Sequence, residues 1–331
     1  MVIFRLPYDD KFYTLNLNST DENSVEWVSF DEATRLGFSG EIQEISAEIL
    51  LSQPLLSSHL EPIETVEEEE SREAYLNKIT QAIQFINEQQ LQKLVISRKK
   101  EIRFTQISDS KSISLTQTFL NLCNSYPNAF VYLLNDKVCW MGAFSELLGK
   151  YNKQTSEFET MSLAGTIPIS ETWTKKEIEE QKPVTQFIEN ILKQYSETLS
   201  ISETYDHISG NIKHLRTDFK SFIAPKDLES LISELHPTPA VCGIPKTICK
   251  EAIRKLEKHD RKFYAGYIRV ETESEILYFV NLRCGEFRPD GASLYVGGGI
   301  TALSHPEKEW LETELKSEAI LKNLAIFEEA T

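Results

Sequence analysis

Basic residues are scarce in this sequence: 35 Lys and Arg stand against 51 Asp and Glu, and the formal net charge is −16. A chain with this charge repels a nucleic-acid backbone and an anionic membrane surface at long range. We therefore expect neither nucleic acid nor a membrane as a partner. A small anionic substrate can still bind where a few cations converge in a shielded cleft.

The cysteine patterns that mark disulfide frameworks or zinc sites are missing as well. The five cysteines are odd in number, and none stands in a CxxC pair or at a His/Cys ligand spacing. No apolar run is long enough to span a bilayer, and the N-terminus MVIFRLPYDD has no basic segment followed by a long apolar one. These absences predict a soluble, unprocessed protein of the reducing cytoplasm.

Apolar periodicity predicts the main helices and strands. Helical spacing covers residues 75–86, 115–123, 175–195 and 306–327, and Pro183 predicts a bend or a second start in the third of these helices. Strand patterns cover residues 91–104, 264–271, 276–284 and 293–296, and a hairpin is expected over residues 129–141. Because helices and hairpins alternate without a βαβ period, the sequence favours an α+β fold over a doubly wound parallel sheet.

The sequence before residue 70 is less regular. Residues 1–60 mix short strand-like runs with polar turns, and the acidic stretch EPIETVEEEE at 61–70 is either a solvated linker or the charged start of a helix. We divide the chain into a variable N-terminal part, 1–65, and a core, 66–328, within one domain that covers residues 1–331.

Two glutamates and a lysine share one face of the last predicted helix. Glu309, Glu312 and Lys316 are spaced by three and four residues, so their side chains project in similar directions. Such a face is usually solvated and salt-bridged. Here three glycines precede it, and a glycine loop at 297–299 would leave backbone N–H groups open to a carboxylate or phosphate. The combination is a candidate site for a metal–carboxylate complex.

Other charged residues allow two interpretations each. Glu180, in the run KEIEEQ, is either solvated or one of several magnesium ligands from separate elements. Arg283, in the apolar run YFVNLRC, either pairs with an internal carboxylate or faces the carboxylate of a ligand. His214 by itself is more often a structural histidine than a ligand. Lys93 is of a residue type that is ordinarily exposed, and Glu146 could simply begin a helix.

Ten short motifs, taken together and in order, resemble the chorismate-utilising enzymes, the family of anthranilate, aminodeoxychorismate, isochorismate and salicylate synthases. They span residues 93–316 and are KLVISR, GAFSELLG, SLAGT, KEIEEQ, HLRT, HPTPAVCG, DRKFYAGYI, NLRC, GGGI and PEKEWLETELK. The resemblance implies one large α/β sandwich of mostly antiparallel sheets flanked by helices, like anthranilate synthase component I. It also implies an active site in a central cleft.

By the same resemblance, Mg²⁺ links the protein to the ring carboxylate of chorismate, with Glu180 and Glu312 as ligands and Glu309 acting through water. Magnesium prefers such hard oxygen ligands and retains some of its water. The residues implied in substrate binding are Arg283 and Lys316 for the carboxylate of the enolpyruvyl group, and Gly165, Thr166, His214, Thr217, Gly298 and Gly299 as lining.

Three features indicate the isochorismate synthase branch. Lys93 stands where the members that use water carry a lysine, Ala164 replaces the nucleophilic lysine of aminodeoxychorismate synthases, and HPTPA resembles the isochorismate branch. The resemblance then implies an isomerase. Lys93, as a neutral amine, removes a proton from the water that attacks C2, while protonated Glu146 donates a proton to the departing C4 hydroxyl. The cleft must favour the uncharged form of both groups.

Two positions depart from the family pattern. Ile169 stands where an arginine is common, and Gln181 replaces a histidine beside the metal-binding glutamate, and these changes bear on loop structure and affinity. The alternatives are a salicylate synthase, which also eliminates pyruvate, and a non-catalytic chorismate-binding relative. We expect the product to feed menaquinone or siderophore biosynthesis. We also expect a cytoplasmic monomer without a glutaminase subunit, formed by a single chorismate-binding domain.

Overall fold

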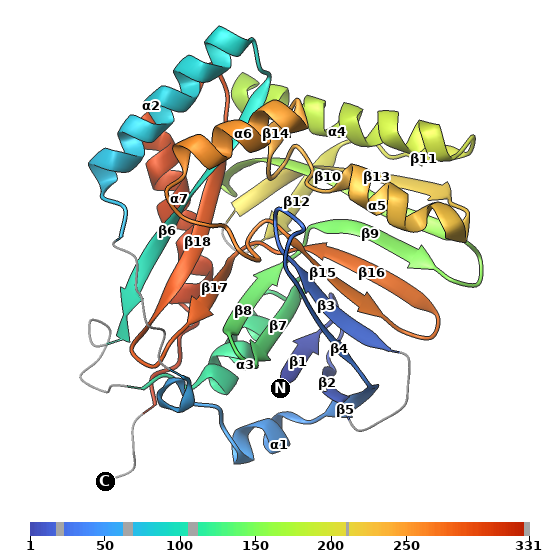
Figure 1. Ribbon diagram of the computed structural model, residues 1–331, viewed down its shortest axis with the longest axis vertical. Coiled ribbons are helices and arrows are strands. Elements are labelled where there is room, and N and C mark those ends of the chain that lie inside the picture. The colour runs from blue at the N-terminus through green and yellow to red at the C-terminus, as the bar shows by residue number, and fades with distance from the viewer. Residues whose placement is uncertain (18–22, 62–68, 105–111, 210–211, 328–331) are drawn as a thin grey trace.

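Two β-sheets face each other across a hydrophobic core in the computed structural model, and helices cover their outer faces (Figure 1). The structure describes residues 1–17, 23–61, 69–104, 112–209 and 212–327. Within these ranges each sheet has nine strands, and neighbouring strands pair in antiparallel register throughout. This architecture confirms the predicted α+β sandwich.

The first sheet contains the strand that begins with Lys93. Its described strands, in spatial order, are β14 (Gly243–Ile244), β6 (Lys93–Arg103), β18 (Gly291–Ile300), β17 (Cys284–Phe287), β8 (Cys139–Phe144), β7 (Phe130–Asn135), β1 (Val2–Arg5), β2 (Phe12–Asn16) and β5 (Glu41–Ile45). The central pair β6 and β18 runs side by side from Gly291 opposite Arg103 to Ile300 opposite Leu94. This pairing brings the glycines of β18 next to the start of β6.

The second sheet lies opposite the first. Its described strands, in spatial order, are β11 (Leu199–Ile201), β13 (Ile212–Phe222), β10 (Glu157–Pro168), β9 (Leu147–Asn152), β16 (Glu275–Val280), β15 (Tyr267–Glu271), β3 (Ser24–Val28) and β4 (Arg35–Ser39), with β12 (Tyr205–Ser209) also paired to β13. The pairing of β10 with β13 shifts register between Ala164 and Ile167, which places a bulge in β10 at Gly165 and Thr166.

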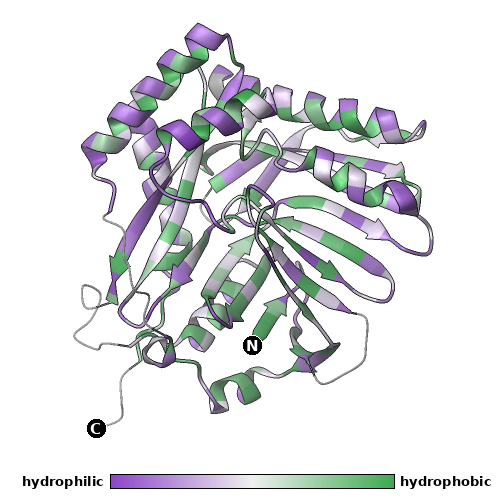
Figure 2. Cartoon of the chain, viewed as in Figure 1, coloured by the Kyte–Doolittle hydropathy of each residue, from purple (hydrophilic) through white to green (hydrophobic). Residues whose placement is uncertain are grey.

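Seven helices occur among the described residues: α1 (Ala47–Ser52), α2 (Arg72–Gln89), α3 (Leu115–Ser125), α4 (Lys175–Tyr195), α5 (Leu228–Leu235), α6 (Lys246–Leu256) and α7 (Pro306–Leu321). On the first sheet, α2 contacts β6, α7 contacts β18, and α3 contacts β7 and β8, whereas α4 and α5 contact the second sheet. Figure 2 shows α2 and α4 with alternating hydrophilic and hydrophobic turns, as expected of helices with one buried face.

Side-chain alternation along the strands explains how the layers pack. Phe130 and Tyr132 of β7 point into the core between the sheets, and Val131 between them points toward α3. The ring of Phe130 stacks on Phe279 of the second sheet at 4.5 Å between centroids, and Trp27 lies 5.5 Å from Tyr132. Aromatic contacts of this kind hold the two sheets together.

The predicted N-terminal part is built into both sheets. β1, β2 and β5 belong to the first sheet, and β3 and β4 belong to the second. Most of the acidic stretch at 61–70, namely residues 62–68, lies outside the described residues. After it α2 begins at Arg72, and the side chain of Ser71 accepts a hydrogen bond from the N–H of Ala74 as the N-cap.

Most predicted elements are confirmed, and four boundaries are wrong, one of which is the start of β15 at Tyr267 instead of residue 264. α2, β6, α3, α4 and the β7–β8 hairpin lie where expected, and α4 continues across Pro183. The last helix ends at Leu321 instead of residue 327, because residues 325–327 pair with residues 112–114. The N–H of Ser114 donates to the carbonyl of Ala325, and the N–H of Phe327 donates to the carbonyl of Ser112. The strand predicted at 276–284 is two strands, and that predicted at 293–296 extends over residues 291–300. None of the described helices is long and apolar enough to cross a membrane.

Candidate active site

The site lies where the chain crosses between the two sheets at two neighbouring places. The chain leaves β8 in the first sheet and enters β9 in the second through Ser145 and Glu146, and it returns from β16 to β17 through residues 281–283. The N–H of Val280 donates to the carbonyl of Glu146 at 3.0 Å, and that of Ala143 donates to the carbonyl of Arg283 at 3.3 Å. Each crossing therefore fixes the backbone of the other.

These crossings correct two expectations. Glu146 begins no helix but lies in the link between two strands, and Arg283 is not inside a strand. The backbone of Arg283 has a φ of +43°, in the left-handed region that non-glycine residues seldom adopt. The apolar run around Arg283 resembles one continuous strand, because residues on both sides of the crossing are buried in the same core.

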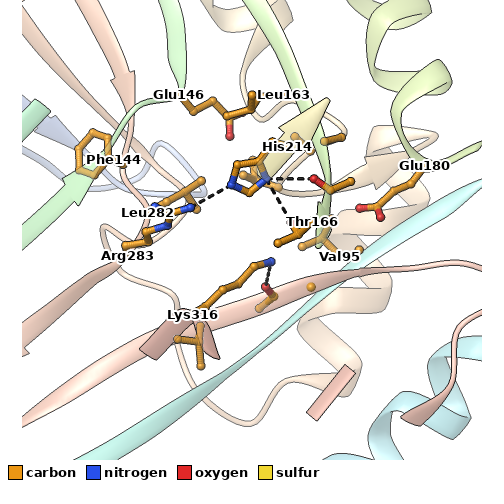
Figure 3. A pocket seen from close by; sticks show the side chains of 18 of the residues that line it. Val95, Phe144, Glu146, Leu163, Thr166, Glu180, His214, Leu282, Arg283 and Lys316 are labelled. Atoms are coloured by element: carbon orange, nitrogen blue, oxygen red, sulfur yellow. Dashed lines mark hydrogen bonds between the residues drawn. The ribbon is translucent and has the colours of Figure 1, made fainter. Parts of the chain in front are cut away.

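A cavity at the crossings holds most of the predicted site residues. The space that opens there between the sheets, together with the solvent at its mouth, amounts to about 780 Å³. Ten of the thirteen predicted residues line it: Lys93, Glu146, Gly165, Thr166, Glu180, His214, Arg283, Gly298, Gly299 and Lys316. In Figure 3, Glu146, Glu180 and Lys316 point into this space from three different elements.

A buried ion pair joins Lys93 to Glu180 at one wall. Lys93 Nζ lies 2.9 Å from Glu180 Oε1, and the two side chains are 1% and 10% exposed. β6 supplies the lysine and α4 the glutamate. Both charges are withdrawn from water. If one side chain turned away and nothing replaced it, the other would remain as an unpaired buried charge.

The sequence predicted a loop at the three glycines 297–299. They instead belong to the last part of β18, opposite Ser97, Ile96 and Val95 of β6. Their small size makes room for the charged groups. A Cβ at Gly299 would stand 2.1 Å from Glu180 Oε1 and 2.6 Å from Lys93 Cε. A Cβ at Gly298, on the opposite face of the strand, would stand 3.1 Å from Glu309 Oε2 and 3.5 Å from Glu312 Oε1.

Gly299→Ala is expected to lower the free energy of unfolding by about 1–3 kcal/mol, because the added methyl group overpacks the Lys93–Glu180 pair. Urea unfolding followed by tryptophan fluorescence measures this loss. Gly37→Ala on β4 is the matched control, because its Cβ would meet only the Glu26 side chain, at 3.8 Å from Cγ and 3.9 Å from Cβ. This variant should change stability by less than about 0.5 kcal/mol. Equal stability of the two variants would contradict the close packing at Gly299.

A histidine holds the guanidinium of Arg283 in place. His214 Nδ1 lies 3.0 Å from the carbonyl oxygen of Gly165, an acceptor, so this nitrogen donates the proton. The opposite nitrogen, Nε2, then accepts from Arg283 Nη2 at 2.9 Å (Figure 3). Burial, with Arg283 as a nearby charge, keeps the pKa of His214 well below its usual value, in agreement with a neutral ring. Arg283 also donates to Ser209 Oγ, so both recorded side-chain partners are neutral.

α7 contributes Lys316, the second of the two cations that the resemblance assigns to a substrate carboxylate. Lys316 Nζ donates to the carbonyl of Gly297 at 2.8 Å and to Glu312 Oε1 at 2.7 Å. It reaches this carbonyl because β17 pairs with β18 only up to Tyr295, which leaves the edge of β18 open toward the cavity. Glu309 and Glu312 do not line the cavity themselves. Glu309 is fully buried behind Gly298, and Glu312 reaches the site through Lys316.

Glu146 faces the cations from the opposite side of the cavity. Burial raises the pKa of its carboxyl group to about 7, although the nearby charges of Lys93, Lys316 and Arg283 act in the other direction. Thr238 Oγ1, 3.5 Å from Glu146 Oε1, is its hydrogen-bond partner. A carboxyl group with this pKa carries a proton over part of the neutral range and can donate it.

The remaining predicted residues lie around the cavity. Thr217 lies outside its lining and accepts a hydrogen bond from Gln181 Nε2 at 3.1 Å. The same amide nitrogen lies 3.1 Å from Ser162 Oγ, so Gln181 connects α4 to β10 and β13. Ala164 lines the cavity, whereas Ile169 follows β10 and is exposed.

Sequence reasoning missed the residues that support the predicted ones. Thr238 lies in the motif HPTPA and Tyr264 in DRKFYAGYI, so the contact of Thr238 with Glu146 and the place of Tyr264 in the lining could have been suspected. Ser209 carries no local signal for its place beside Arg283. As for a metal, no three His, Cys, Asp or Glu side chains among the described residues converge as a complete ligand set.

Known proteins resemble this chain in sequence. A family model described as chorismate binding enzyme matches residues 10–325. The chain is 28% identical over 272 residues to the vibriobactin-specific isochorismate synthase of Vibrio cholerae, which covers 76% of this chain and 66% of the relative. It is 24% identical over 292 residues to isochorismate synthase DhbC of Bacillus subtilis, covering 81% and 70%. The chain thus spans about two thirds of the length of these relatives.

Solved structures share the fold at low sequence identity. MenF, the menaquinone-specific isochorismate synthase of Escherichia coli, matches with a TM-score of 0.77 at 19% identity over 97% of this chain and 88% of its own. Anthranilate synthase component I of Streptococcus pneumoniae matches with a TM-score of 0.69 at 16% identity over 92% and 82%. These matches confirm the predicted likeness to anthranilate synthase component I. With a family model that covers nearly its whole length, the chain belongs to the chorismate-binding enzymes.

Proposed function

We propose that this protein is an isochorismate synthase, an isomerase that adds water at C2 of chorismate and releases the C4 hydroxyl. The observation that carries the proposal is that Lys93 and Glu146 line the same cavity as Arg283 and Lys316. An acid–base pair and two cations meet there in a protein whose net charge is −16. The names of the relatives in Vibrio cholerae and Bacillus subtilis support the same reaction.

Substrate binding rests on Arg283 and Lys316. A guanidinium that His214 and Ser209 hold in a fixed plane suits a two-point contact with a carboxylate. Lys316 adds a second positive charge at the open edge of β18. Together they would bind the carboxylate of the enolpyruvyl group and orient the ring between Lys93 and Glu146.

The proton transfers follow from the two remaining groups. Lys93 acts as the base only as a free amine, so it must lose its proton and its ion pair with Glu180 before it activates water. Glu146 holds a proton below a pH of about 7 and gives it to the departing hydroxyl. Protonating this hydroxyl turns a poor leaving group into water.

We also propose Mg²⁺ as the cofactor, with Glu180 and Glu312 as ligands and Glu309 behind them. The fit rests on Glu180, which lies at the position that a Cβ of Gly299 would fill, and on Glu312, which approaches from the other face of β18 and reaches the site through Lys316. Magnesium accepts one or two protein carboxylates and completes its shell with water and substrate oxygens, so a full protein ligand set is not needed. The bound ion would neutralise the ring carboxylate of the substrate.

The deciding experiment is product analysis with the purified protein, chorismate and Mg²⁺. We expect isochorismate to form without ammonia and to be lost when a chelator is added. Chromatography separates the possible products. Salicylate and pyruvate as main products would replace the proposal with a salicylate synthase, and unchanged chorismate would leave a protein that only binds it.

Lys316→Ala is expected to raise the KM for chorismate by at least about tenfold while kcat changes much less, because the lysine contacts a part of the substrate remote from the reacting carbons. Initial rates over a range of chorismate concentrations measure both constants. Lys308→Ala, an exposed lysine on the same helix, is the control with the same change of charge. A normal KM in Lys316→Ala would remove this residue from the binding site.

A further inference from the structure

A buried ion pair behind the cavity connects its two reactive sides. Glu257 follows α6, and Arg261 lies four residues later; both side chains are 2% exposed. Arg261 Nε donates to Glu257 Oε2 at 2.9 Å, and Nη2 donates to Oε1 at 2.6 Å. The contact is therefore bidentate, which fixes the plane of the guanidinium. Neither residue belongs to the cavity lining.

The same two side chains also bind backbone groups of the cavity walls. Arg261 Nη1 donates to the carbonyl of Val241 at 2.8 Å, and Nη2 donates to the carbonyl of Val95 at 2.9 Å. Glu257 Oε1 accepts from the N–H of Ser97 at 2.6 Å. Val95 and Val241 both line the cavity, so this pair holds two walls from behind.

These walls carry the proposed base and the partner of the proposed acid. Val95 lies two residues after Lys93 on β6, so their side chains are on the same face of the strand. On the other wall, the N–H of Val241 donates to the carbonyl of Thr238 at 3.0 Å, which closes a turn. Thr238 in turn contacts Glu146 through its hydroxyl group.

We propose that Glu257 and Arg261 are positioning residues that fix the separation between Lys93 and Glu146 across the cavity. The proposal rests on the function proposed above for the roles of these two groups. A buried ion pair is a weak source of stability, since two apolar residues of similar size are often as stable, whereas its geometry is specific. Lysine could not replace Arg261, because Arg261 makes four hydrogen bonds and an ammonium has only three N–H donors.

The test uses the double variant Glu257→Leu with Arg261→Met, which removes both charges and the backbone contacts without leaving one charge buried alone. We expect its thermal midpoint to stay within a few degrees of wild type, its KM within about threefold, and its kcat to fall about 10–100-fold, as for a small misplacement of reacting groups. Glu257→Gln, whose amide oxygen can still accept from Ser97 and Arg261, should retain much of the kcat. A folded double variant with the kcat of wild type would overturn the proposal.

A second measurement tests the proposal without measuring catalytic turnover. It also applies if the double variant does not fold. The carboxyl carbon of Glu146 can be followed by NMR in protein labelled with ¹³C-glutamate and assigned by its absence in Glu146→Gln. Glu146 faces Lys93 on β6, Arg283 at the crossing and Lys316 on α7. We expect its titration midpoint to move by about half a pH unit or more in the double variant or in Arg261→Lys. An unmoved midpoint would overturn the positioning role, whereas a wild-type protein without isochorismate synthase activity would refute only the proposed function.

Discussion

Replacing Lys93 with alanine is expected to lower the kcat of isochorismate formation by about 10²–10⁴-fold, the usual contribution of a general base. The lysine is 1% exposed at the wall of the cavity, so bulk solvent does not readily supply a substitute. Product chromatography at saturating chorismate and Mg²⁺ measures the loss. Binding of Mg²⁺, followed by calorimetry, should persist or become tighter, because Glu180 loses the ammonium that pairs with it.

The control for this substitution is Lys137→Ala, at the exposed turn between β7 and β8, which should retain the kcat of wild type. It makes the same change of net charge far from the crossings. If Lys93→Ala formed isochorismate at the rate of this control, another group would have to be the base, and the proposed mechanism would be wrong.

Glu146→Gln is expected to lower kcat by a similar factor, because an amide has the shape of the carboxyl group but cannot protonate the departing hydroxyl. In wild type, kcat should fall as the pH rises through about 7, since burial raises the pKa of Glu146 to about 7 and the group must carry its proton. A pH–rate profile of both proteins measures this fall in kcat around a pH of about 7, which the variant should lack.

The same ionisation gives a readout in stability. The folded protein retains a proton on Glu146 that the unfolded chain releases near a pH of about 4.3. The contribution of this group to the free energy of unfolding is therefore fully present below a pH of about 4.3. It is lost as the pH rises through about 7. Glu146→Gln should remove this part of the pH dependence, and Glu88→Gln on the exposed side of α2 should not. If kcat of Glu146→Gln declined with pH in the same way as that of wild type, the decline would have to come from another titrating group.

Local patterns in the sequence account for much of the fold. The spacing of Tyr75, Ile79, Ala82 and Ile86 predicted α2 because it follows from one buried face. The apolar run 129–134 and the turn after it predicted the β7–β8 hairpin. The break at residues 281–283 could not be predicted in this way. Both sides of a crossing between packed sheets are buried, so hydrophobicity stays continuous while the backbone changes direction.

The site is a different case. No periodicity marks Lys93 or Glu146, and they were identified only through motifs that keep a common order along the chain. The contacts that give these residues their chemical properties come from distant segments. Lys93 meets Glu180 of α4, and Glu146 meets Thr238, and neither distance follows from spacing along the sequence. The glycines of β18 lie in the cavity lining, where they make room for side chains and do not form a loop.

The paired crossings of β8–β9 and β16–β17 limit how this molecule can move. Two covalent connections, hydrogen-bonded to each other, join the sheets beside the cavity, so the sheets cannot swing apart there as two lobes on a hinge. Substrate must enter through rearrangement of side chains and helix ends around a rigid frame. Turnover of this enzyme should therefore be sensitive to changes in the packing of α4 and α7, and insensitive to the lengths of the β-hairpin turns at the far ends of the sheets.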